Sequence, residues 1–129
     1  MSFSNYLEDK VLDHVLGEGL RNFTSPATLF ISLHSADPGE TGASELSGNG
    51  YARVAANFAA SSAGSSSISA DVVFGPAVTA DWLQATHFGV YDASTAGNFL
   101  MGGALTTPQT IVVGATGTFS TGNLTASLD

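Results

Sequence analysis

The feature that most constrains the fold is a series of short alternating segments separated by turn-forming residues. After Pro26 the apolar side chains of Leu29, Ile31 and Leu33 alternate with their neighbours at the period of two that is typical of a strand. Further β candidates lie at residues 51–58, 68–74, 85–91, 98–106, 110–113, 117–120 and 124–128. Short strands at regular spacing predict a mainly β fold, an antiparallel sandwich or a jelly-roll-like domain.

The N-terminal segment has a different period. Its apolar residues recur at helical spacing, which predicts one α-helix at about residues 4–16. Asn5 suits the N-cap, with Ser4 as the competing cap, and Gly17 offers a stop. Residues 36–50 are dense in Gly, Pro, Ser and Asn, so we expect a long exposed loop there. Residues 92–97 should form a hairpin connection.

The length favours one domain spanning residues 1–129, whose hydrophobic core is large enough to be stable without disulfides or structural metal ions. Cysteine is absent from the sequence, which excludes disulfides and thiolate chemistry. The N-terminus lacks the basic and apolar regions of a signal peptide, so we expect the protein to be made and to stay in a cytoplasm until it is assembled or released by lysis. The small-residue segment at 59–67 is a connector within the domain rather than a boundary between domains.

Charge is strongly one-sided. The formal net charge is −8, and no lysine or arginine occurs from residue 54 onward. This balance argues against binding to DNA, RNA or anionic membranes, because those partners need fixed cations. No apolar run approaches the roughly 20 residues that span a bilayer. A polar but uncharged surface is instead suited to packing against other proteins.

The residues that could carry chemistry do not form a recognisable motif. His14, His34 and His87 lie on separate predicted elements without metal-ligand spacing, although His34 and His87 could meet across a sheet. The loop acids Asp37, Glu40 and Glu45 suggest a calcium site, but a solvated loop is the simpler interpretation. We therefore expect no catalytic residues, no metal, no cofactor and no enzymatic activity; a glycan hydrolase built on paired carboxylates is a remote alternative.

Protein contacts are the more promising role for the remaining polar and aromatic side chains. Arg53, predicted on the 51–58 strand, is either a solvent-facing arginine or an anchor to a carboxylate on another subunit. A partly exposed Trp82, with Tyr51, Tyr91 and Phe99, could instead form a stacking platform for sugars. The predicted interface residues are Lys10, Arg21, Arg53, Asp37, Glu40, Tyr51 and Trp82.

Several stretches of the sequence resemble a family of small virion structural proteins of tailed bacteriophages. The resemblance lies in SNYLEDKVLDHVLG (4–17), PATLFISLHSADP (26–38), GNGYAR (48–53), THFGVYDA (86–93), GNFLMGGAL (97–105) and GNLTASL (122–128). It covers almost the whole chain. Members of the family are labelled structural or tail fibre-like proteins, similar small β-proteins serve as capsid cement, and no catalytic residues belong to the family.

The resemblance implies a virion component and leaves head and tail open. The sequence has no repeat and no stalk, unlike a long fibre, which favours a capsid decoration (cement) protein. Such a protein would stabilise the head as a homotrimer on the major capsid protein or another virion protein. The alternative is a tail fibre or baseplate-associated component that binds a host receptor or glycan.

Overall fold

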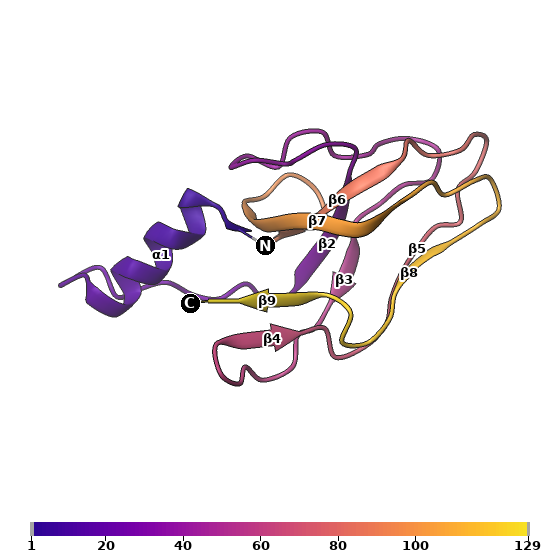
Figure 1. Ribbon diagram of the computed structural model, residues 1–129. Helices are drawn as coiled ribbons and strands as arrows, with labels where there is room; N and C mark the ends of the chain where they lie inside the picture. The colour runs from indigo at the N-terminus through magenta and orange to yellow at the C-terminus, as the bar shows by residue number, and fades with distance from the viewer. Residues whose placement is uncertain (1, 129) are drawn as a thin grey trace.

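The strands form one five-stranded sheet and two two-stranded ribbons in the computed structural model, which describes residues 2–128 (Figure 1). The elements are β1 (Ser2–Phe3), α1 (Asn5–Leu16), β2 (Leu29–His34), β3 (Val54–Ala56), β4 (Ser65–Ser67), β5 (Val72–Phe74), β6 (Ala85–Tyr91), β7 (Phe99–Gln109), β8 (Gly117–Phe119) and β9 (Thr125–Ser127). The prediction of a mainly β, antiparallel fold with one N-terminal helix is confirmed.

The large sheet has the strand order β1-β7-β6-β2-β3, and each neighbouring pair is antiparallel. Strands β2 and β6 pair from Phe30 opposite Tyr91 to His34 opposite His87, so the two histidines do meet across the sheet. The predicted hairpin between β6 and β7 is also present, because the Asp92 N–H donates to the Asn98 carbonyl across residues 92–97. Ribbons β4–β9 and β5–β8 complete the β structure.

The main core lies between one face of the large sheet and the two ribbons. On β2 the alternating side chains of Ile31 and Leu33 are buried on this face; Phe74 of β5 and Leu124, just before β9, are buried with them. Phe119 of β8 packs edge-on against Phe88 of β6, with ring centroids 6.0 Å apart. Alternation along each strand thus delivers its apolar side chains to a shared interior.

The opposite face of the large sheet is covered by the loop between β2 and β3. Ser32 and His34 lie on this face and are fully buried. The loop was expected to be exposed, but Pro38, Gly42 and Leu46 are buried against the protein. Gly42 has φ +76°, and a Cβ added there would meet the Tyr91 hydroxyl, so glycine permits this close approach. Turn-forming residues predicted the loop correctly but not its contacts.

Helix α1 begins and ends close to its predicted bounds. The cap is Ser4, the competing candidate, whose hydroxyl accepts a hydrogen bond from the Leu7 N–H and donates to the Phe99 carbonyl. Gly17 follows the last helical residue, and its N–H donates to the Asp13 carbonyl. The helix extends away from the sheet at one end of the molecule (Figure 1).

Several predicted strand boundaries were wrong. The 51–58 strand shortens to β3, so Tyr51 and Arg53 precede the strand rather than lie on it. Residues 110–113 form an irregular segment with a single bridge from Val113 to Ala77. Strand β4 lies in the serine-rich connector, and β1 was not predicted. Pairing partners decided these boundaries, and local propensity does not identify partners.

Candidate functional site

The main charged cluster joins two loops at the edge of β3. The Arg53 guanidinium donates from Nε and Nη2 to the two carboxylate oxygens of Glu45, each at 2.8 Å. Its Nη1 donates to the carbonyls of Ala93 and Ala96 in the β6–β7 hairpin. The guanidinium also lies over the Tyr91 ring, 3.4 Å from the centroid. Arg53 therefore uses its donors within its own chain.

The electrostatics of this cluster favour its charged form. Burial opposes ionisation of Glu45, but hydrogen bonds from Arg53 and Tyr51 outweigh it and hold the pKa of the carboxyl below its usual value. The hydrogen bonds to Glu45 raise the pKa of Arg53 further. The Arg53 side chain is 8% exposed and that of Glu45 is 22% exposed. The cluster thus clamps the β2–β3 loop to the β6–β7 hairpin.

His34 is the second buried polar group, and its bonds are structural too. Its Nδ1 lies 2.7 Å from the Ala43 carbonyl, and its Nε2 lies 2.8 Å from the Ser32 hydroxyl. Burial lowers the pKa of His34 below its usual value, although the bond to Ala43 opposes that shift. Neither Asp37 nor Asp92 contacts the ring. The bond to Ala43 ties the β2–β3 loop to the sheet face, and the bond to Ser32 fixes the ring against β2.

The aromatic residues expected to bind sugars are packed inside the protein. Trp82 is 4% exposed, not partly exposed as expected, and its indole N–H donates to the Asn49 carbonyl. Tyr91 and Phe99 are each 5% exposed. Tyr51 stacks on Phe74, accepts a hydrogen bond from the Leu33 N–H and donates to Glu45. A stacking platform made of these rings is therefore wrong, because their faces are occupied by other side chains.

The remaining predicted interface residues lie on the surface near the helix. Lys10 and Arg21 are exposed, and the Lys10 ammonium lies 5.8 Å from the centre of the Tyr6 ring. Glu40 is exposed, yet its carboxylate accepts a 2.6 Å hydrogen bond from the Asn5 N–H at the start of α1. Asp37 accepts from the Gly39 N–H in the same loop. Their role in an interface stays a prediction.

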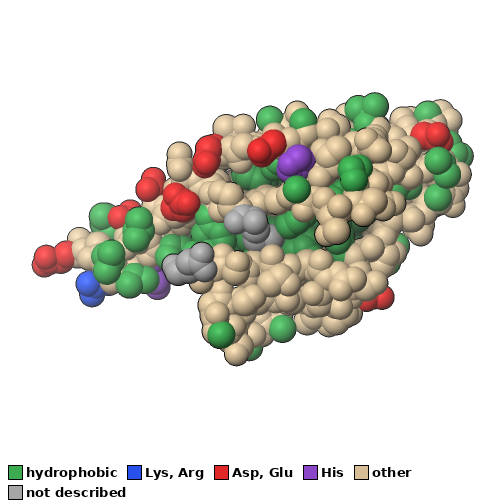
Figure 2. Space-filling model, in the orientation of Figure 1, with side chains coloured by type: hydrophobic (Ala, Val, Ile, Leu, Met, Phe, Trp, Pro, Cys, Tyr) green, Lys and Arg blue, Asp and Glu red, His purple; other side chains and the backbone are tan. Residues whose placement is uncertain are grey.

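The sequence predicted an amphipathic helix that reaches a neighbouring subunit, but not how much of its apolar stripe is exposed. Of the residues within α1, only Leu7 is buried, while Leu12, Val15 and Leu16 are 55%, 61% and 70% exposed. Figure 2 shows hydrophobic side chains gathered over this helix. The apolar stripe of an amphipathic helix usually packs on the core of its own domain. The exposed stripe here has no cover within residues 2–128.

A second apolar surface lies at the opposite end of the molecule. Residues 77–83 and 111–114 are held together by hydrogen bonds from Trp82 N–H to the Ile111 carbonyl and from Val113 N–H to the Asp81 carboxylate. We call these two segments the tip. Its exposed apolar side chains are Val78, Leu83, Val112 and Val113, between 48% and 69% exposed. Figure 1 places these loops at the end of the molecule away from α1.

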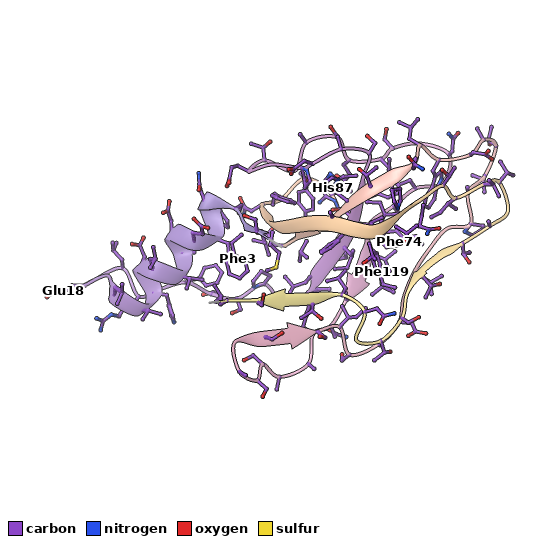
Figure 3. All side chains as sticks on the ribbon, viewed as in Figure 1. Phe3, Glu18, Phe74, His87 and Phe119 are labelled. Atoms are coloured by element: carbon purple, nitrogen blue, oxygen red, sulfur yellow. The ribbon has the colours of Figure 1, made fainter. Side chains whose placement is uncertain are left out.

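A cleft opens between the β6–β7 pair and the β5–β8 ribbon. Its cavity has a volume of about 360 Å³, and its floor includes the aromatic rings of Phe74, Phe88 and Phe119. Phe74 and Phe119 lie together beneath β7 in Figure 3, with centroids 6.2 Å apart. The lining contains no charged residue: the polar members are Thr106, Thr107, Gln109, Thr118 and Asn123. Such a cleft is suited to an apolar, uncharged group.

The described residues show neither a metal centre nor a membrane-spanning helix. Among residues 2–128, no group of three or more histidine and acidic side chains is placed to hold a metal ion. No helix in that part of the chain is long and apolar enough to cross a membrane. Asp71 accepts hydrogen bonds from the Thr121 N–H and hydroxyl, which lower the pKa of its exposed carboxyl.

Comparison with known proteins identifies the group to which the chain is similar. Residues 2–127 match the family described as podophage GP4 fiber I protein gp80. No curated protein matches the sequence. The match spans nearly all of the chain and agrees with the resemblance found in the sequence. The chain therefore belongs to the podophage GP4 fiber I protein gp80 family and is a structural component of a tailed-phage virion.

Proposed function

We propose that the chain is a non-enzymatic fibre component of the virion, assembled as a homotrimer and attached to at least one other virion protein. The family description supports a fibre over a capsid decoration protein bound to the major capsid protein. The side chains with potential for chemistry support a structural role, because Arg53, Glu45 and His34 are engaged in bonds that hold loops in place.

One observation carries this proposal: exposed apolar side chains gather at both ends of the molecule. The helix presents Leu12, Val15 and Leu16 at one end, and the tip presents Leu83 at the other, 69% exposed. Exposed apolar patches mark sites of protein contact. Contact surfaces at opposite ends allow the chain to contact its own copies at one end and another virion protein at the other, as a fibre component requires. A decoration protein would instead need a lateral docking surface.

The experiment is to locate the protein in the intact phage. Particles carrying a short epitope tag after the C-terminal residue are labelled with gold-conjugated antibody and imaged by cryo-electron microscopy. We expect label on fibres; label spread over the head capsomers would overturn the proposal. Leu83→Glu at the tip should lower incorporation into virions at least about fivefold, since one charge disrupts an apolar contact. Val73→Glu, exposed on β5 and outside both the tip and α1, is the control.

A further inference from the structure

The exposed stripe of α1 requires an occupant. Leu12 and Leu16 are four residues apart, so their side chains lie about 6 Å apart along one face of the helix. They are among the most exposed large apolar side chains of the described chain. An amphipathic helix normally buries such a stripe. Here α1 contacts the protein mainly near its start, through β1 and β7.

Charge decides against a lipid surface as that occupant. Glu8, Asp9 and Asp13 lie on the helix and Lys10 is its only lysine or arginine. Helices that lie on membranes carry lysine and arginine on their polar face, because the lipid headgroups include anions. An acidic helix would be repelled. The partner surface should therefore be apolar and free of acidic groups.

The chain itself offers such a surface in the cleft between β6–β7 and β5–β8. The cleft has an apolar floor, a rim of hydroxyl and amide groups, and no charged lining residue. Its volume of about 360 Å³ corresponds to roughly twelve water-sized groups at about 30 Å³ each. That space accommodates the eight side-chain carbons of two leucines. The hydroxyl and amide groups of the rim can donate hydrogen bonds to the acidic side chains of the helix or to water, without like-charge repulsion.

We propose that Leu12 and Leu16 of one copy insert into the cleft of a second copy. This inference deepens the proposed function, on which it rests, by naming the partner of the helix end. Each copy gives one helix and receives one, so the contact is head-to-tail; such contacts form a ring when their rotation closes, and the homotrimer proposed above is a ring of three. Direct pairing of the helices would bring their Glu8, Asp9 and Asp13 side chains together, whereas the uncharged cleft avoids that repulsion.

The absence of cysteine permits a specific cross-linking test. Two single variants, Leu16→Cys and Thr107→Cys, are purified, mixed and oxidised under mild conditions. Because each chain has one thiol, a disulfide between the two variants can only join different copies. We expect that mixed species to form at least about tenfold more than for Leu16→Cys with Ser62→Cys, which lies outside the cleft lining. Cross-linking confined to Leu16→Cys with itself would overturn the proposal.

Substitution by a charge gives an independent readout that does not depend on oxidation. Leu16→Glu alters a side chain that is 70% exposed, so folding is retained. Light scattering coupled to size exclusion should show wild type at three times the 13.1 kDa chain mass. Leu16→Glu should raise the dissociation constant at least about tenfold, or about 1.4 kcal/mol. Leu83→Glu, 69% exposed at the tip, should not.

The two proposals fail in different ways. A wild-type chain that stays monomeric at every concentration, with no mixed disulfide above control, refutes insertion of the helix into a cleft. Gold label on fibres would in that case still support the fibre assignment. Conversely, label on the head with mixed disulfide present would refute the fibre assignment and leave the contact between copies intact.

Discussion

Replacement of Arg53 by methionine tests the main structural claim about the charged cluster. Arg53 makes four hydrogen bonds, two to the Glu45 carboxylate and two to hairpin carbonyls, and stacks on Tyr91. Methionine keeps apolar volume but leaves Glu45 with Tyr51 as its remaining side-chain partner. The variant therefore isolates the loss of the guanidinium from the loss of packing.

The expected loss of unfolding free energy in Arg53→Met depends on how deeply the ion pair with Glu45 is buried. Removal of one partner of a buried ion pair costs about 3–5 kcal/mol. Glu45 is 22% exposed, so water stabilises part of its charge and places the cost near 3 kcal/mol. At about 4 °C per kcal/mol for a chain of this size, the melting temperature should fall by about 12 °C. Arg53→Lys should recover only part of this loss, because lysine lacks the bidentate fork.

Urea and thermal unfolding measure the effect, with Lys10→Met as the exposed control. The double variant Arg53→Met/Glu45→Gln should recover about 1 kcal/mol over Arg53→Met, because it removes the unpaired charge. The pKa of Glu45 is depressed from 4.5 in the fold, so its stabilising contribution exists above that pH and is lost below it. The destabilisation caused by Arg53→Met should therefore become smaller toward pH 3, where Glu45 is increasingly protonated. A cost equal to that of Lys10→Met would refute the structural role.

Three further predictions concern the buried contacts around the β2–β3 loop and the helix cap. The pKa of His34 is depressed from 6.5, so the unfolded state binds a proton at a higher pH than the folded state does, and the free energy of unfolding should fall as the pH drops below 6.5. Urea unfolding at several pH values should show a weaker pH dependence of this free energy for His34→Gln than for wild type; an equal pH dependence would contradict the prediction. Gly42→Ala should cost more than about 2 kcal/mol because its Cβ meets Tyr91, whereas Gly39→Ala, with open space at φ +58°, should cost about 1 kcal/mol by the same assay. Ser4→Ala should cost about 1–2 kcal/mol through loss of the cap and of the bond to Phe99; an unchanged urea midpoint would contradict this.

The strand pattern predicted the fold well where alternation was strong. Residues 85–91 coincide with β6, and the alternation of Leu29, Ile31 and Leu33 identified β2. It failed at 110–113, where an apolar run became irregular backbone bridged to Ala77. It also missed β4, because a run of serines becomes a strand only when β9 supplies hydrogen-bond partners. Such partner strands are distant in the sequence, so the propensities of neighbouring residues cannot predict them.

For the candidate site, too, the sequence identified individual residues, whereas the fold decided their contacts. Arg53 and Tyr51 were recognised as residues of interest, yet the sequence left open whether a carboxylate partner lay on the same chain; the fold brings Glu45 to both. Trp82 was expected to be partly exposed and is buried, because Asn49 and Tyr51 contact it from the β2–β3 loop. The cleft combines residues from β2, β5, β6, β7 and β8, and no local motif marks it.

By itself the sequence determined the period of each segment, the position of the helix and the acidic, cysteine-free character of the chain, since these depend on neighbouring residues and composition. Only the tertiary structure decided which apolar residues are covered. Leu7 and Leu16 lie on the same helix, but Leu7 is 8% exposed and Leu16 is 70% exposed. The difference arises because the body of the protein meets only the first part of the helix, and burial depends on what packs against a side chain rather than on its identity.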